Sequence, residues 1–267
     1  MVRTLSAMAE TEIHPTAIVD PGTEIGAGVV IGPYCVIHAG VRIGDRCRLQ
    51  NHVTIDGPTE IGSGNCFYPY GSIGQQTQDL KYVGEPTHLV IGDDNTFREF
   101  VTVHRATGTG NATRIGNRGN FLAYCHIAHD CTVGDDVIIS NNGTLGGHVV
   151  IEDHAILGGL TGVHQFCRIG RLAITGGCTK IVQDVPPYML IDGNPARVRG
   201  LNNIGLQRKG IGEESINALK QAHRTIFRGD LNVSQATEST KQSPAAADPH
   251  VQHLIAFLDS SERGVIR

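Results

Sequence analysis

The sequence predicts an all-β fold, a parallel β-helix of hexapeptide repeats, followed by a small α-helical C-terminal domain. Two observations predict the β-helix: apolar residues recur every six positions, and the chain has 34 glycines among 267 residues. Neither the helical period of about 3.6 nor the strand period of about 2 produces a repeat of six. A chain that turns every six residues does, and three short strands then close one triangular coil of eighteen residues.

The apolar positions of the hexads are predicted to form the core of the coil. Every sixth residue from Ile13 to Ile73 is apolar, and the same phase holds from Ile115 to Ile169. Glycine often follows the apolar residue, as Gly44 follows Ile43. Because glycine accepts positive φ and close backbone contact, it suits the corner of a tight coil.

Two stretches break the period and are predicted to be loops extruded from the coil, at about 74–90 and 105–114. In the first, the core positions fall on Asp79 and Glu85, and in the second on Thr109. A charged side chain cannot face an apolar core without a partner. We therefore expect the β-helix domain to cover residues 11–190 with these two loops.

Residues 191–267 are predicted to form the α-helical C-terminal domain. Apolar residues lie at helical spacing over 213–227. Asp248 and Pro249 form an N-cap and first-turn pair that opens a second helix. Between these helices, Ser239–Ala247 is predicted to be a polar connector.

The bulk composition excludes several classes of protein. A net charge of −4 gives no indication of nucleic-acid binding. No apolar run is long enough for a membrane span, and Met1–Glu10 lacks the apolar stretch of a secretory signal. Seven cysteines without a CxxC pair favour reduced thiols that fill the core, and thus a cytoplasmic protein. No cofactor is predicted.

The repeat converts sequence spacing into spatial proximity, because residues eighteen apart should lie one above another. Three such columns share the same coils, and they bring histidines, an aspartate and glycines together. These columns are His129, Gly147 and Gln165; Asp130, His148 and Phe166; and His126, Thr144 and Gly162, with His164 beside Gln165.

This predicted cluster allows three interpretations. His129 is a general base held by Asp130, with the Gly147 N–H receiving an oxyanion. Alternatively, three histidines hold zinc, as in β-helical carbonic anhydrases. In the third, the histidines only stack on the surface of a non-catalytic scaffold. The clustering favours the first interpretation, with no metal in the site.

Several motifs in the sequence resemble those of bacterial UDP-N-acetylglucosamine O-acyltransferases, the enzymes of the first step of lipid A synthesis. The matching segments are HPTAIV (14–19), QDLKYVGEPT (78–87), VTVHR (101–105), HIAHDCTVG (126–134), GGHV (146–149), VHQFC (163–167) and QDVPPY (183–188). The resemblance implies a left-handed β-helix and a homotrimer with active sites between subunits. It also implies transfer of a 3-hydroxyacyl group from acyl carrier protein to the 3-hydroxyl of UDP-GlcNAc.

The resemblance also implies roles for particular residues. His129 is the general base, Asp130 orients it, and Gly147 supplies the oxyanion N–H. The residues implied to bind substrate are Gln78, Asp79, Lys81, His104, His126, His148, His164, Gln165, Asn202, Arg208 and Lys209. Gly177 takes the position that sets acyl-chain length, and a glycine there implies a chain of about 14 carbons.

The sequence departs from the family at two of its substrate positions. Lys209 replaces the second arginine of a usual Arg-Arg pair, and bidentate phosphate binding is not expected of a lysine. Pro195 replaces a histidine, so no substrate role is carried over to it. A rival within the superfamily is the glucosamine N-acyltransferase of the same pathway, which has an extra N-terminal domain that this chain lacks.

Overall fold

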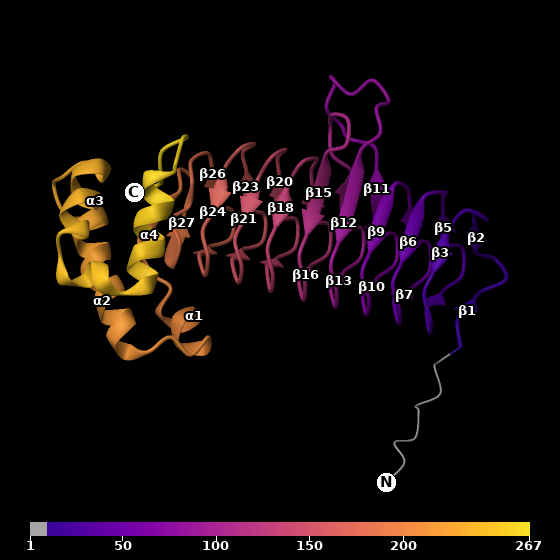
Figure 1. The fold of residues 1–267 in the computed structure, drawn as a ribbon, viewed down its shortest axis with the longest axis horizontal. Coiled ribbons are helices and arrows are strands. Elements are labelled where there is room, and N and C mark those ends of the chain that lie inside the picture. The colour runs from indigo at the N-terminus through magenta and orange to yellow at the C-terminus, as the bar shows by residue number, and fades with distance from the viewer. Residues whose placement is uncertain (1–9) are drawn as a thin grey trace, which may run out of the picture. The chain divides into compact units, whose positions relative to one another are not determined.

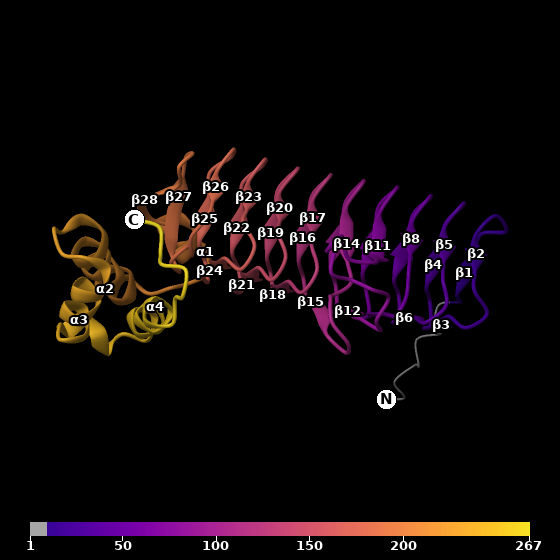
Figure 2. The ribbon, with the colours of Figure 1, turned by 90° about the horizontal axis from the view of Figure 1, so that it is seen from above.

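The computed structural model describes residues 10–267. Residues 1–9 of the N-terminal segment considered above for a secretory signal lie outside the described residues. The described chain divides into two compact units, residues 10–136 and 137–267. Figures 1 and 2 show their elements in two orthogonal views.

The first unit is a coil with three sides, each a parallel sheet of short strands. One sheet contains β1 (Glu12–Ile13), β4 (Val30–Ile31), β7 (Arg48–Leu49), β10 (Cys66–Phe67), β13 (Thr96–Phe97) and β16 (Asn120–Phe121). The second contains β2 (Ile18–Val19), β5 (Val36–Ile37), β8 (Thr54–Ile55), β11 (Ser72–Gln75), β14 (Thr102–His104) and β17 (His126–Ile127). The third contains β3 (Glu24–Ile25), β6 (Val41–Ile43), β9 (Thr59–Ile61), β12 (His88–Ile91), β15 (Ala112–Ile115) and β18 (Thr132–Val133).

The second unit begins with the same strand pattern. Its strands are β19 (Ile138–Ile139), β20 (Thr144–Leu145), β21 (Val150–Ile151), β22 (Ile156–Leu157), β23 (Gly162–Val163), β24 (Arg168–Ile169), β25 (Ile174–Thr175), β26 (Lys180–Ile181), β27 (Met189–Asp192) and β28 (Arg197–Leu201). β28 pairs antiparallel with β27. The helices follow: α1 (Asn203–Arg208), α2 (Glu213–His223), the π-helical η1 (Arg224–Arg228), α3 (Val233–Lys241), the 3-10 helix η2 (Pro244–Ala247) and α4 (Pro249–Asp259).

The pairing within each unit has the predicted register of eighteen residues. Arg42 pairs with Glu24 in the first unit, and Arg168 pairs with Val150 in the second. The register is longer where the excursions leave the first coil: Cys66 pairs with Thr96, thirty residues on. Excursions are thus accommodated without loss of the strand ladder, and they rise from the coil beside β11 and β15 (Figure 1).

The hexad positions fill the axis of the coil. Phe67, Phe97 and Phe121 are fully buried and stack with ring centroids 4.9 Å apart. Glycine is required where adjacent coils approach: a Cβ on Gly44 would lie 2.6 Å from the carbonyl carbon of Gly62. Such contact is too close for any side chain, which explains why glycine follows the apolar position.

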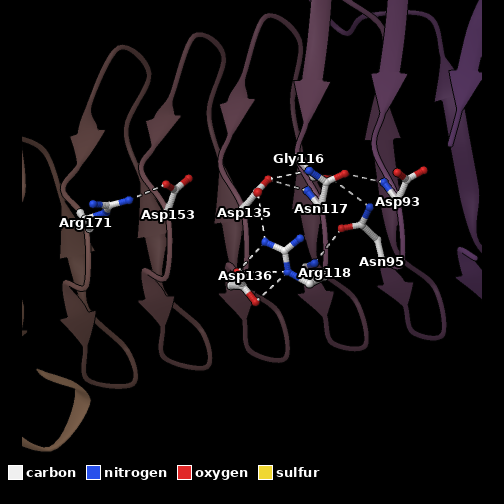
Figure 3. A network of polar contacts seen from close by, with 10 residues as sticks. Asp93, Asn95, Gly116, Asn117, Arg118, Asp135, Asp136, Asp153 and Arg171 are labelled. Atoms are coloured by element: carbon white, nitrogen blue, oxygen red, sulfur yellow. Dashed lines mark hydrogen bonds and ion pairs between the residues drawn. The ribbon is translucent and has the colours of Figure 1, made fainter. Parts of the chain in front are cut away.

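Polar side chains tie successive coils together at one corner of the first unit. Asn95 is buried; its amide nitrogen donates to the Gly116 carbonyl at 2.9 Å, and its oxygen accepts from Gly119 N–H at 2.7 Å. Arg118 reaches the carboxylates of Asp135 and Asp136 at 3.1 and 2.9 Å (Figure 3). The two Asn95 hydrogen bonds satisfy backbone groups that the tight turns leave without strand partners.

The helical region differs from the sequence prediction in two respects. The α-helical domain was predicted to start at residue 191, but β27 and β28 extend to Leu201 and the first helix begins at Asn203. Ser239–Ala247 was expected to be a connector, but its first residues end α3 and its last form η2. α3 buries Ala236, Thr237 and Thr240. Because these side chains are small or polar, α3 carries no apolar stripe that a periodicity search would detect.

Candidate active site

His129 and Asp130 follow strand β17 at a corner of the coil. Nδ1 of His129 lies 2.8 Å from Oδ2 of Asp130, and the two side chains are 12% and 8% exposed. Asp130 has φ of 58°, and its N–H donates to Oγ1 of Thr113 at 2.9 Å. Aspartate tolerates this left-handed conformation better than most residues. The turn therefore directs the carboxylate back onto the preceding imidazole.

Two further histidines of the first unit lie on the strands that lead to this corner. The rings of His104 and His126 meet edge to face with centroids 4.8 Å apart, and His126 Nδ1 lies 2.7 Å from Oγ1 of Thr102. Burial, reinforced by the neighbouring His126, His129 and Arg105, lowers the pKa of His104 to about 4. Burial, followed by His129, also lowers the pKa of His126. Both imidazoles are therefore neutral near pH 7.

His104 also lines a hollow under the first excursion. The hollow has a volume of about 500 Å³ and is lined by Gln76, Thr77, Gln78, Asp79, Leu80, Tyr82 and His104. Nδ1 of His104 is buried and has no hydrogen-bond partner within the described residues. Gln78 and Asp79 thus lie with His104 around this hollow, whereas Lys81 is not among the lining residues.

The second unit holds a separate group of the predicted residues. Gly147, His164 and Gln165 line a hollow of about 460 Å³, together with Gly146, Gly162 and Lys180. Nδ1 of His164 lies 3.3 Å from a guanidinium nitrogen of Arg263. His148 does not line this hollow, and its ring stacks on Phe166 with centroids 4.5 Å apart.

Asn202, Arg208 and Lys209 line another cavity of the second unit. Its volume is about 460 Å³, and apolar residues such as Leu190 and Ile204 complete its walls. Asn202 has a structural part as well, because its side chain accepts from Gly205 N–H at 3.0 Å and caps α1. An apolar wall with two cations at its rim suits a planar ring attached to phosphate.

Gly177 is exposed at a corner of the second unit. A Cβ at this position would lie 3.3 Å from the carbonyl oxygen of Gly159, which precedes it by eighteen residues. A side chain there would need only a small adjustment of its neighbour.

The contacts of three residues on or beside the excursions were not predicted from the sequence. The N–H of Thr107 donates to Oδ2 of Asp130 at 2.9 Å, and Glu85 accepts from the adjacent Gly108 N–H at 2.9 Å. Arg105 is buried and pairs with Asp56 at 3.0 Å. Glu85 gave a signal in the sequence, a charge at a core position of the period. The Thr107 contact gave none, because it comes from the backbone.

Five of the seven cysteines have the properties of core residues, as predicted, whereas Cys66 is half-buried and Cys178 is exposed. Cys35, Cys47, Cys125, Cys131 and Cys167 are buried. Burial raises the pKa of the Cys167 thiol to about 11 and raises that of Cys35 as well. A thiol with a raised pKa is a weak nucleophile at neutral pH.

The family models that match the chain describe its two parts. The model for the bacterial transferase hexapeptide (six repeats) matches residues 10–45 and 22–57. The model for "Udp N-acetylglucosamine O-acyltransferase; Domain 2" matches residues 184–266. Across residues 10–267, no helix combines the length and the apolar character needed to cross a membrane.

Curated relatives and solved structures agree with these models. The acyl-[acyl-carrier-protein]--UDP-N-acetylglucosamine O-acyltransferase of Synechocystis is 49% identical over 96% of this chain and 92% of its own length. The crystal structure of UDP-N-acetylglucosamine O-acyltransferase from Moraxella catarrhalis is 44% identical, with a TM-score of 0.91 over 96% of this chain and 99% of that one. The structure from Bacteroides fragilis is 36% identical, with a TM-score of 0.93 over 96% and 100% of the two chains.

The fold class is therefore the one that the sequence predicted, a left-handed parallel β-helix of hexapeptide repeats with a small α-helical C-terminal part. The identity to the Synechocystis relative extends over nearly the full length of both chains. The chain belongs to the family of UDP-N-acetylglucosamine O-acyltransferases, and it is an enzyme of that kind.

Proposed function

We propose that this enzyme transfers a 3-hydroxyacyl group from acyl carrier protein to the 3-hydroxyl of UDP-GlcNAc, the first step of lipid A synthesis. The names of the relatives support the two substrates. The observation that carries the mechanism is the 2.8 Å contact between His129 Nδ1 and Asp130 Oδ2. We further propose that the enzyme works in the cytoplasm as a homotrimer, with its active sites between subunits.

In the proposed reaction, His129 acts as a general base through Nε2. Asp130 accepts the hydrogen bond from Nδ1–H and so leaves the lone pair on Nε2. Nε2 takes the proton of the sugar hydroxyl as its oxygen attacks the thioester carbonyl carbon. The C–S bond then breaks, and the imidazolium returns the proton to the departing thiolate. The products are an O-acylated sugar and the free thiol of the carrier.

The oxyanion donor in the proposed reaction is the N–H of Gly147. Gly147 is predicted for this role by the eighteen-residue spacing from His129 and by the family motif. A backbone N–H aimed at the developing oxyanion is the usual device in acyl transfer. A glycine leaves the approach to that N–H open.

The remaining predicted residues are assigned to substrate binding. His104, Gln78 and Asp79, around the hollow under the first excursion, and Lys81 of the same loop are proposed to contact sugar or acyl chain. The residues proposed to line the active-site cleft between subunits are His126, His148, His164 and Gln165. Asn202, Arg208 and Lys209 are proposed to hold the nucleotide, with Lys209 as a point charge rather than a bidentate ligand.

The test compares the wild type with His129→Ala, using UDP-GlcNAc and 3-hydroxyacyl carrier protein as substrates. We expect kcat to fall by about 10²- to 10⁴-fold without loss of the folded state. A fully active His129→Ala protein would support the non-catalytic interpretation of the histidines. Stoichiometric zinc in the purified protein would support the metal interpretation, and acylation of an amino-sugar nitrogen instead of the hydroxyl would support the N-acyltransferase.

A further inference from the structure

The two excursions of the first unit, at about 74–90 and 105–114, are joined to each other by hydrogen bonds. Backbone contacts run along their facing edges: Arg105 N–H to Gln75 carbonyl at 2.9 Å, Ala106 N–H to His88 carbonyl at 3.2 Å, and Gly110 N–H to Pro86 carbonyl at 2.9 Å. The hydroxyls of Thr107 and Thr77 lie 3.0 Å apart. The sequence suggests two independent insertions, but the second excursion is attached to the first along its length.

Glu85 is the acidic side chain that joins the two excursions near their tips. Its Oε1 accepts from Gly108 N–H of the second excursion at 2.9 Å. Its Oε2 accepts from Val83 N–H of its own excursion at 2.9 Å. Hydrogen bonds from the backbone of Val83, Glu85 and Gly108 hold the pKa of the Glu85 carboxyl below its usual range. Glu85 is therefore an anion near pH 7, with one oxygen on each excursion.

The residue next to Gly108 contacts the partner of the proposed base. The N–H of Thr107 donates to Asp130 Oδ2 at 2.9 Å, and His129 Nδ1 lies 2.8 Å from the same oxygen. Two donors on one oxygen restrict the rotation of the carboxylate.

We propose that Glu85 is a positioning residue for the acyl transfer. By holding Gly108, it keeps the Thr107 N–H on Asp130, and so it connects the substrate loop at 76–87 with the His129–Asp130 pair. The proposal rests on the proposed function, because it assigns His129 and Asp130 to catalysis. Its physical content is that the Thr107 N–H fixes the carboxylate and limits the basicity of His129.

The test measures kcat and the pH dependence of kcat/KM for Glu85→Ala, Glu85→Gln and the control Glu60→Ala. Glu60 is exposed on strand β9 and contacts Arg42 at 3.7 Å. We expect Glu85→Ala to lower kcat by about 10- to 100-fold, because a reacting group misplaced by about 1 Å costs that much. The acidic limb of the pH profile of kcat/KM should move up by about 0.5 to 1 pH unit, because Asp130 loses the Thr107 donor and then holds the His129 imidazolium more strongly.

The conservative variant separates positioning from general damage to the loop. In Glu85→Gln the single carboxamide oxygen still accepts from Gly108 N–H, whereas the bond from Val83 N–H is lost because the NH₂ group cannot accept it. The link between the excursions is kept, so we expect most of kcat and the wild-type acidic limb to return. His104, His126 and Arg105 are charged or titratable groups near the site, and they are unchanged in every variant. A Glu85→Ala enzyme with wild-type kcat and an unmoved acidic limb would overturn the proposal. So would a loss of kcat with an unmoved acidic limb, which is the signature of a merely structural role.

A second measurement does not depend on activity. Hydrogen–deuterium exchange of the peptide that covers 105–111 should become faster in Glu85→Ala and stay at the wild-type rate in Glu60→Ala. Unchanged exchange in Glu85→Ala would contradict the proposed link between the excursions. If the wild type does not acylate UDP-GlcNAc, or His129→Ala stays active, the proposed function fails first, and the exchange result then judges the link alone.

Discussion

Oδ2 of Asp130 lies 2.8 Å from Nδ1 of His129 and 2.9 Å from the backbone nitrogen of Thr107. The carboxylate therefore has its neighbours fixed by a left-handed turn on one side and by an excursion on the other. This arrangement makes the pair a preorganised acceptor for a proton rather than a flexible surface contact.

Replacing Asp130 by asparagine should impair the reaction more than it impairs the fold. The amide keeps the shape but offers no negative charge to an imidazolium, and it can turn its NH₂ toward Nδ1 and select the wrong tautomer. We expect kcat to fall by about 10²-fold or more, and the acidic limb of kcat/KM to move to lower pH. Steady-state kinetics across pH measures both, and an upward shift of the acidic limb would contradict the assigned role.

His104 should make the protein less stable in acid. Burial lowers its pKa to about 4, so at a pH between this value and the ordinary pKa of histidine the unfolded chain binds a proton that the folded chain does not. The contribution of His104 to stability is therefore complete above the unfolded pKa and is lost as the pH falls from about 6.5 toward 4. The expected loss is about 3 kcal/mol.

The measurement compares thermal unfolding at about pH 7.5 and about pH 4.5. His104→Gln should show a smaller decrease of Tm on acidification than the wild type, because the glutamine does not titrate. His14→Gln is the control, since His14 is exposed. Equal slopes for the wild type and His104→Gln would show that another group governs the acid response.

The sequence period predicts the coil and its register, but it does not predict what the excursions touch. Ile25, Ile43 and Ile61 lie on paired strands because each is separated from the next by three hexads. The Thr107 contact depends instead on the path of two irregular loops, and backbone donors carry no signature in the side chains. For the same reason Glu85 stood out only as a charge at a core position, and its two acceptor contacts were not foreseen.

Removing the buried amide of Asn95 should destabilise the first unit. Asn95 donates to the Gly116 carbonyl and to Asn65 Oδ1, and it accepts from Gly119 N–H. Asn95→Ala leaves these buried groups without their partner, at a cost of about 3 kcal/mol. Denaturant unfolding should show this loss, whereas Asn51→Ala, at an exposed hydrogen bond to His52, should stay within about 0.5 kcal/mol of the wild type.

A side chain at position 177 should shorten the preferred acyl chain. The resemblance places Gly177 at the floor of the acyl site, and the structure leaves a Cβ there with its nearest contact at 3.3 Å from Gly159 carbonyl oxygen. Gly177→Met should therefore fold normally while it fills the end of the site. Because each buried methylene contributes about 0.8 kcal/mol, every methylene displaced should lower kcat/KM about fourfold for the long donor.

The assay presents 3-hydroxyacyl carrier proteins of increasing chain length to both proteins. We expect the wild type to prefer a chain of about 14 carbons, because a glycine leaves the site deep, and Gly177→Met to prefer a shorter one. Gly212→Ala is a control away from the proposed site, since a Cβ at Gly212 meets no atom within 4 Å. An unchanged preference in Gly177→Met, or a wild type that already prefers 10 carbons, would remove position 177 from the acyl site, because a residue outside that site does not discriminate by chain length.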